Sequence, residues 1–194
     1  MSNNFPKYKI CVSGAADTSF CGGDAWKIAK QLGKEIASLN LVLVDGATTG
    51  FPLWAAKGAK EANGIVIGVS PAESQKEHIE KYGLPIDYHD LIIYTGFGYS
   101  GRNLLLTRSA DAVVVGCGRM GTVNEFTIAF EDKKPIGILE GSWETDEVVK
   151  NILEKSHRAQ EHSYIAFDSD PKRLLNKLIG FIEENRNNIH LNPY

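Results

Sequence analysis

Short apolar runs alternate along this chain with longer segments in which apolar residues recur at helical spacing. The run Ala112 to Val115 has no polar interruption, which is typical of a strand buried on both faces. From Ala25 to Leu39, apolar residues recur every three or four positions, and this spacing predicts an amphipathic helix with Asp24 as its N-cap. The same patterns predict strands at 8–13, 41–44, 65–69, 91–94, 112–115, 135–139 and 164–167. They predict helices at 25–39, 52–62, 71–81, 99–109, from about 122, at 144–156 and at 171–184.

Strict alternation of strands and helices predicts an α/β fold, with a doubly wound, Rossmann-like and mostly parallel sheet of about six to seven strands. The 194 residues are a length that one core commonly fills, so we expect a single domain at 1–186. Residues 187–194 are polar and are expected to form a loose C-terminal tail. Ligands of such sheets bind beyond the carboxyl ends of the strands, at the topological switch point.

Three loops rich in glycine follow predicted strands: S-G-A-A-D-T-S at 13–19, D-G-A-T-T-G at 45–50 and G-C-G-R-M-G at 116–121. We expect them to converge on one crevice. A helix begins near Thr122, and backbone N–H groups at a helix N-terminus attract anions, so a phosphate is expected there. The candidate phosphate- or nucleotide-binding residues are Ser13, Gly14, Gly46, Thr48, Thr49, Gly50, Asn103, Gly116, Gly118, Arg119, Met120, Gly121 and Thr122.

The glycine loop at 116–121 supports other interpretations. It matches G-x-G-x-x-G, and Glu140 follows it by nineteen residues, as the ribose-binding acid of a dinucleotide site would. That fingerprint usually lies on the first strand of its fold, whereas four strands precede it here. A tight turn that needs glycine would also explain the motif. Thr122 and Glu125 have the spacing of a helix capping box, which without other evidence is the favoured role for this pair.

Composition narrows the classes of partner. The net charge of −3 disfavours a protein that holds nucleic acid through bulk charge, so no nucleic-acid partner is expected. No apolar run approaches the ~20 residues of a membrane helix, and the first residues lack a signal-peptide core. The three cysteines form no evident framework of pairs, which fits a reducing cytoplasm, and Cys117 is expected to be a small buried thiol. The five histidines lack metal-ligand spacing, so no metal is expected.

The segment S-G-R-N-L-L-L-T-R-S-A-D-A-V-V-V-G-C-G-R-M-G-T-V-N-E-F resembles the core of the Lonely Guy (LOG) family, in the SLOG superfamily of Rossmann-type proteins. That family's motif is an arginine on a helix, a D-A strand, and then P-G-G-x-G-T-x-x-E. Arg102 precedes Asp111 by nine residues, as in the family, and Gly118 and Gly121 to Glu125 fit the rest. The loop D-G-A-T-T-G-F-P-L-W is similar to the superfamily's second phosphate-side loop. The resemblance covers roughly 8–139.

The resemblance implies hydrolysis of the N-glycosidic bond of nucleoside 5′-monophosphates, with Arg102 and Glu125 as the catalytic residues and no cofactor. The chain departs from the family pattern at Gly116-Cys117, which replace the first two positions of P-G-G, and at Asn103, where a basic residue follows the family arginine. This version is more similar to a sibling branch that includes a molybdenum-cofactor carrier. The alternative is therefore a non-catalytic carrier or sensor of a nucleotide-like or pterin-type phosphate ligand. A third possibility, a dinucleotide-dependent oxidoreductase, would use Glu140.

A homodimer is the expected assembly. The predicted helices around Trp54 and Phe126 carry more apolar surface than one sheet face obviously needs, and the family resemblance implies dimers or larger assemblies.

Overall fold

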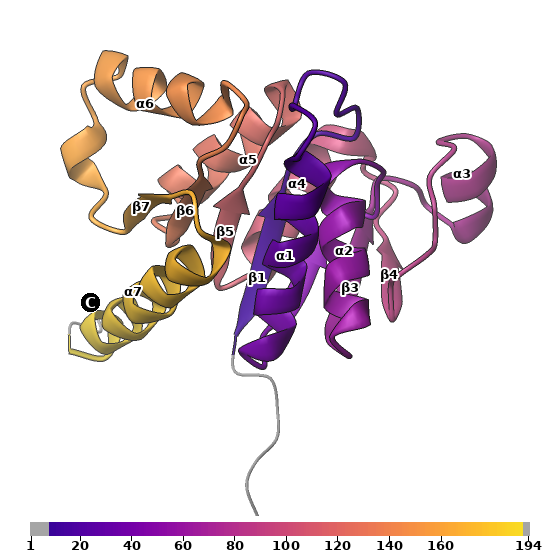
Figure 1. The fold of residues 1–194 in the computed structure, drawn as a ribbon, viewed down its shortest axis with the longest axis horizontal. Coiled ribbons are helices and arrows are strands. Elements are labelled where there is room, and N and C mark those ends of the chain that lie inside the picture. The colour runs from indigo at the N-terminus through magenta and orange to yellow at the C-terminus, as the bar shows by residue number, and fades with distance from the viewer. Residues whose placement is uncertain (1–7, 192–194) are drawn as a thin grey trace, which may run out of the picture.

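The computed structural model describes residues 8–191 of the chain as one α/β domain (Figure 1). Its strands are β1 (Lys9–Ser13), β2 (Val42–Asp45), β3 (Ile65–Ser70), β4 (Leu91–Tyr94), β5 (Ala112–Val115), β6 (Ile136–Leu139) and β7 (Ile165–Asp168). Its helices are α1 (Ala25–Ser38), α2 (Phe51–Glu61), α3 (Gln75–Glu80), α4 (Gly98–Ser109), α5 (Met120–Glu131), α6 (Thr145–Lys155), the 3₁₀ turn η1 (Ala159–Glu161) and α7 (Pro171–Leu191).

All seven strands are parallel and lie in the order β4-β3-β2-β1-β5-β6-β7, which confirms the predicted doubly wound sheet. The chain builds outward from β1 to β4, then returns to the other side of β1 with β5. The switch point therefore lies between β1 and β5. A ligand crevice is expected at their carboxyl ends, beyond Ser13 and Val115.

Two apolar layers cover the sheet. Ile10, Val12 and Val114 pack on the side of α1, α2 and α7, which lie in front of the sheet in Figure 1. The alternate residues Cys11 and Val115 face the other layer, formed by α4, α5 and α6. Because both faces are covered, the central strands are apolar throughout, which is why they appear as uninterrupted runs in the sequence.

Several helix ends differ from the sequence prediction. Helix α3 begins at Gln75 rather than near Pro71, since the Ser74 side chain accepts a hydrogen bond from the Glu77 amide and caps the helix. Asp24 precedes α1, but its side chain makes no capping hydrogen bond. Helix α7 continues to Leu191 instead of ending near Glu184, and residues 192–194 of the expected tail lie outside the described residues.

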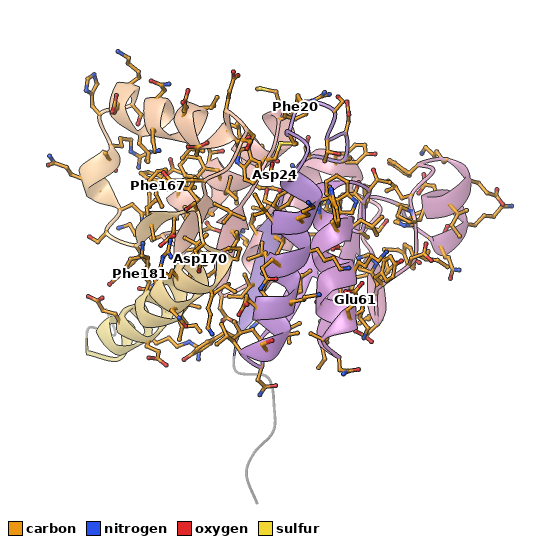
Figure 2. The ribbon with its side chains drawn as sticks, in the orientation of Figure 1. Phe20, Asp24, Glu61, Phe167, Asp170 and Phe181 are labelled. Carbon is orange, nitrogen blue, oxygen red and sulfur yellow. A yellow bond between two sulfur atoms is a disulfide. The ribbon has the colours of Figure 1, made fainter. Side chains whose placement is uncertain are left out.

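Figure 2 labels side chains at the two opposite ends of the sheet. Phe20 and Asp24 lie where the loop after β1 enters α1, whereas Glu61 lies at the far end of α2. We call the end near Phe20 the carboxyl edge of the sheet and the opposite end the amino edge. Within residues 8–191, no helix combines the length and hydrophobicity that a membrane span requires.

Candidate functional site

A cavity of about 460 Å³ opens at the carboxyl edge, at the switch point between β1 and β5. Its walls come from the loop after β1, the loop after β2, the start of α5 and the inner face of α4. The convergence of the three glycine-bearing loops is thus confirmed. We call this cavity the crevice.

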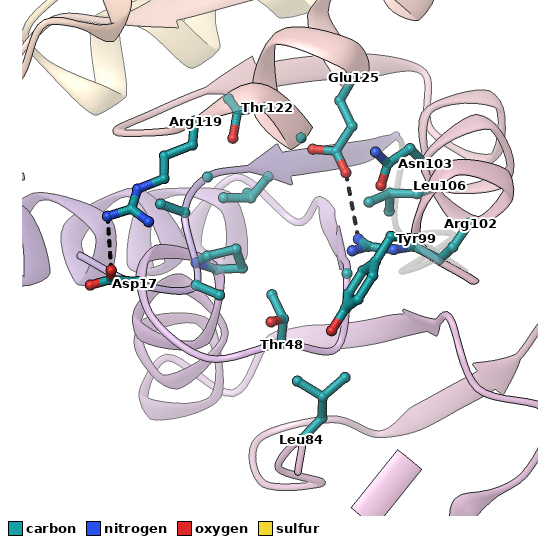
Figure 3. Close-up of a pocket in the computed structure, with 17 residues that line it drawn as sticks. Asp17, Thr48, Leu84, Tyr99, Arg102, Asn103, Leu106, Arg119, Thr122 and Glu125 are labelled. Atoms are coloured by element: carbon teal, nitrogen blue, oxygen red, sulfur yellow. Dashed lines mark hydrogen bonds and ion pairs between the residues drawn. The ribbon is translucent and has the colours of Figure 1, made fainter. Parts of the chain in front are cut away.

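Glu125 projects from α5 into the crevice, where Figure 3 shows it opposite Arg102 of α4. The Ser13 hydroxyl donates a hydrogen bond to Glu125 Oε2, and Arg102 Nη1 lies 3.5 Å from Oε1. Glu125 is only 5% exposed, and this burial raises the pKa of its carboxyl group, although the Arg102 charge and the Ser13 hydrogen bond oppose the shift. The carboxylate therefore serves as a partly compensated counter-ion to Arg102.

Arg102 is buried but poorly satisfied. The residue is 7% exposed, its single bond to Glu125 is long, and its Nε has no hydrogen-bond partner. Its guanidinium lies against Gly46, where an added Cβ would lie 1.9 Å from Nη1, so any other residue at this position would displace the guanidinium. A planar cation that lines a cavity and has incomplete hydrogen bonding is suited to bind an anionic oxygen.

The loop after β2 is held in place by a buried pair. Asp45 Oδ1 accepts a hydrogen bond from the Ala47 amide at 2.8 Å and lies 2.8 Å from His89 Nε2. Burial acts against protonation of His89, but the hydrogen bond and charge of Asp45 prevail and raise the pKa of His89. Farther along, the Phe51 amide and the Thr49 hydroxyl donate to the carbonyls of residues 15 and 16. These contacts fix Thr48 on the wall of the crevice.

The glycine loop after β5 has mixed roles. A Cβ at Gly116 would lie 2.3 Å from the Phe51 ring, so this glycine accommodates packing between the loop and α2. The Gly118 amide donates to Thr145 Oγ1 at 2.8 Å. Gly121 and Thr122, in the first turn of α5, line the crevice, and amides of a first helical turn have no acceptor within the helix. The anion-binding capacity of this loop lies mainly in that turn.

The capping-box interpretation of Thr122 and Glu125 is wrong. Helix α5 begins at Met120 with Arg119 as its N-cap, and no side chain caps it. Glu125 consequently lies in the second turn, where its carboxylate reaches Ser13 and Arg102 instead of the helix N-terminus.

The expectation that the cysteines are unpaired is also wrong. Cys21 and Cys117 form a disulfide between the loop after β1 and the glycine loop, and Cys11 is the free cysteine of the described chain. The partners are 96 residues apart, and only the parallel pairing of β1 with β5 brings their loops together. The argument for a reducing compartment therefore loses its basis.

Glu140, the ribose-binding acid of the dinucleotide alternative, lies outside the crevice. Its carboxylate accepts a hydrogen bond from Lys150 Nζ at 2.9 Å. Glu140 is therefore not placed to bind a ribose in the crevice, and its spacing no longer supports an oxidoreductase.

The structure separates the predicted site residues into two groups. Those lining the crevice are Gly14, Gly46, Thr48, Arg102, Asn103, Arg119, Gly121, Thr122 and Glu125. Those outside its lining are Ser13, Thr49, Gly50, Gly116, Gly118 and Met120. Ser13 still acts on the site through its bond to Glu125.

Eight further lining residues were not predicted, among them Tyr99, Asp17 and Leu84. Tyr99 precedes Arg102 by one helical turn, so the i, i+3 spacing could have identified it. Asp17, which pairs with Arg119 at 2.8 Å, lies in a loop that the sequence did single out (Figure 3). Leu84 enters from the segment between α3 and β4, for which no sequence signal exists. Within residues 8–191, no group of three histidine, cysteine or acidic side chains is arranged to hold a metal ion.

A Rossmann-type sheet with a charged crevice at its switch point defines a class of ligand-binding α/β proteins. The SLOG cluster4 family model matches residues 7–175, and the chain belongs to this family. An uncharacterized protein of Archaeoglobus fulgidus is 30% identical over 131 residues, which are 68% of this chain and 81% of that protein.

Several solved structures resemble the protein along most of its length, including the following two. The molybdenum cofactor carrier protein of Chlamydomonas reinhardtii has a TM-score of 0.70 and 28% identity, over 92% of this chain and 99% of that one. The molybdenum cofactor binding protein of Rippkaea orientalis has a TM-score of 0.64 and 26% identity, over 91% and 94% of the two chains.

Proposed function

We propose that the protein is a carrier or sensor that binds a phosphorylated, nucleotide-like or pterin-type ligand in the crevice without converting it. The observation that carries this proposal is Arg102, a buried guanidinium that lines the cavity beside the first turn of α5 and whose Nε has no hydrogen-bond partner. The ligand phosphate lies between this guanidinium and the amides of Gly121 and Thr122, with Thr48 on the opposite wall.

The surroundings of Glu125 favour binding over turnover. A carboxylate that stabilises a ribosyl cation must be free to approach the sugar. Here its two oxygens face Ser13 and Arg102, which are groups of the protein itself. Its role in this proposal is to hold Arg102 in position. The resemblance to two proteins described as carrying or binding molybdenum cofactor supports the same conclusion.

Calorimetric titration with AMP, GMP and a phosphorylated pterin tests the proposal. Arg102→Met should weaken binding at least about tenfold, since charge-assisted hydrogen bonds contribute about 1.5–3 kcal/mol. Arg108→Met is the matched control, because Arg108 lies on the same helix but pairs with Asp132 at the surface. Equal affinity of wild type and Arg102→Met for every ligand would contradict the proposal.

A phosphoribohydrolase is the second candidate. It is favoured by the meeting of Arg102 and Glu125 in one crevice with the start of α5. In this case wild type releases adenine from AMP, and Glu125→Gln lowers turnover by roughly 10²–10⁴, the scale of a lost acid–base group. Chromatography of AMP incubated with each protein separates the candidates. A carrier releases no base, whether Glu125 is present or not.

We also propose a homodimer, although not through the surfaces expected from the sequence. Phe126 is 1% exposed and belongs to the core, whereas Trp54 is partly buried and packs against the core. Exposed apolar side chains gather on the edge strand β4, at Leu91 and Ile93, and at Phe97, the 68% exposed N-cap residue of α4. In the sheet, Leu91 lies beside Ile67 and Ile93 lies beside Val69. Ile67 and Val69 belong to the apolar layer that includes α4, so Leu91 and Ile93 face the same side of the sheet. An apolar sheet edge of this kind is commonly covered by a partner.

Light scattering tests the dimer. Wild type should have twice the mass of one chain at micromolar concentration, and the double variant Leu91→Lys/Phe97→Asp should have the mass of one chain. Met120→Asp replaces an exposed apolar side chain far from β4 with a charged one, and this variant should remain dimeric. A wild-type mass equal to one chain would exclude the dimer.

A further inference from the structure

A second hollow of about 550 Å³ lies beside the crevice, on the other side of Arg119. It is bounded by Phe20 of the loop after β1, by the start of α5 and by the segment from Ser142 to Val148 at the start of α6. Both cavities have the volume of small-molecule sites.

The N-terminus of α5 separates the two cavities. Gly121 and Thr122 of its first turn line the crevice, whereas the residues on either side of them, Met120 and Val123, line the hollow. An anion bound at this helix end therefore has the crevice on one side and the hollow on the other. A ligand that continues beyond such an anion would enter the hollow.

The lining of the hollow includes apolar side chains that the fold leaves exposed, beside the polar side chains of Arg119, Ser142, Glu144 and Thr145. Met120 is 80% exposed, and Phe20 and Val148 are about half as exposed, while Trp143 is buried among the lining residues. Single exposed apolar residues are ordinary, but several around one concavity are typical of a ligand surface. The crevice differs, since its deepest groups are the charges of Arg102 and Glu125.

Arg119 forms the wall between the cavities and can move. Its guanidinium pairs with Asp17 at 2.8 Å, and Figure 3 shows this pair at one end of the crevice. The guanidinium also lies 4.4 Å from the centre of the Phe20 ring. Both partners of the pair are more than half exposed, and exposed pairs contribute little to stability. A phosphate at the start of α5 can therefore replace Asp17 as the partner of Arg119 with little loss of stability. The resulting movement of Arg119 would connect the two cavities.

We propose that the hollow is a second subsite, which binds an aromatic ring joined through a phosphate or pyrophosphate to the group in the crevice. The ligand class is thus one with two ring systems on either side of the phosphates, as in a dinucleoside pyrophosphate. This inference rests on the proposed function, because it takes the phosphate at α5 as given. The Phe20 ring and the apolar floor supply stacking and burial for the second ring.

Titration with AMP, ADP and diadenosine pyrophosphate tests the subsite, because ADP has the second phosphate without the second ring. Wild type should bind diadenosine pyrophosphate at least about tenfold more tightly than ADP, the scale of one stacked base. Val148→Asp places a charge in the hollow and should abolish this preference while AMP affinity stays that of wild type. Phe20→Ala should reduce the preference independently, and Asn151→Asp, which adds the same charge elsewhere on α6, should preserve it.

The outcomes separate this inference from the proposed function. If AMP binds and diadenosine pyrophosphate binds no better than ADP, the subsite is excluded while phosphate binding stands. If no member of the series binds, both are excluded. If Val148→Asp changes the mass in light scattering and leaves the preference intact, the hollow contacts a second copy and the subsite is excluded.

Discussion

The two edges of the sheet each hold a carboxylate beside β5, and the two carboxylates are satisfied very differently. At the amino edge, Asp111 accepts hydrogen bonds from the Lys9 amide, from Lys9 Nζ and from Arg186, at 2.7 to 3.0 Å. At the carboxyl edge, the Glu125 carboxylate accepts hydrogen bonds from Ser13 and from the Asn103 amide in the orientation that satisfies its neighbours, but its charge partner Arg102 lies 3.5 Å away and has an unpaired Nε. The ion pairs of the first cluster are thus complete, whereas the cation of the second has incomplete hydrogen bonding.

The difference also appears in the pKa values. Burial disfavours ionisation of Asp111, but the hydrogen bonds and charge of Lys9 outweigh it and lower the pKa of this carboxyl group. Burial prevails at Glu125 and raises its pKa. A satisfied carboxylate stabilises the fold, whereas a buried and poorly paired one is maintained at a cost to stability, as is common at functional sites.

The largest expected effect concerns the disulfide, which connects two loops at the carboxyl edge and has no counterpart among the described residues of the amino edge. The double variant Cys21→Ala/Cys117→Ala should lower the free energy of unfolding by about 4 kcal/mol, because the bond closes a loop of nearly 100 residues in the unfolded chain. Urea unfolding of wild type with and without a phosphine reductant measures the same quantity. The double variant should not respond to the reductant.

Thiol titration of the denatured wild type supplies an independent check. One reactive thiol, from Cys11, is expected without reductant. Three thiols, together with an unfolding midpoint that does not depend on reductant, would contradict the disulfide.

The next effect is that of Arg102→Met, which should destabilise the protein by about 3 kcal/mol because it leaves a buried carboxylate without its counter-ion. The double variant Arg102→Met/Glu125→Gln should recover part of this loss, since it removes the charge that Arg102 compensates. Urea unfolding of the four proteins of this cycle gives the coupling energy. Additive effects would show that the two side chains do not interact.

The sequence predicted the sheet better than it predicted the ends of the helices. Ala112 to Val115 was placed correctly because a parallel strand that is covered by helices on both faces is apolar along its length. Leu91 to Tyr94 was also placed correctly from its apolar run, although this edge strand is partly exposed. Helix α3 and the end of α7 were misplaced because amphipathic spacing does not show where a cap such as Ser74 begins the helix.

The site could be predicted only where it depends on topology. Carboxyl ends of parallel strands meet at one edge, so the glycine loops were correctly brought together. The meeting of Arg102 with Glu125 was available only from a family resemblance. The Cys21–Cys117 bond and the Asp17–Arg119 pair depend on loop conformations, for which local sequence contains no periodic signal.

The pH dependence of stability should have opposite signs at the two edges. A raised carboxyl pKa favours the folded state below the unfolded value of about 4.5, and this contribution is lost as pH rises through the folded pKa. The stability of Glu125→Gln relative to wild type should therefore increase from pH 4 to pH 8.

Asp111 has a lowered pKa, so its contribution to stability is present above about pH 3.8 and is lost as pH falls. Asp111→Asn should accordingly be less stable than wild type at pH 7 and approach it in acid. Urea unfolding across this pH range measures both, and parallel profiles for the two variants would contradict the comparison.

The smallest expected effect is that of Arg186→Gln at the amino edge. Arg186 donates to Asp111 at 3.0 Å and lies over the Tyr8 ring, but its side chain is about half exposed. Solvent screens such a pair, and Asp111 retains both bonds from Lys9, so the loss should be about 0.5 kcal/mol at low salt. It should shrink further at 1 M salt, where the screening length falls to about 3 Å.

The buried Arg102–Glu125 pair is shielded from the same ions, so the Arg102→Met effect should change little over this salt range. Urea unfolding of both variants at low and high salt makes the contrast quantitative. If Arg186→Gln cost as much as Arg102→Met, or if both effects disappeared together in salt, burial would not be what distinguishes the two edges.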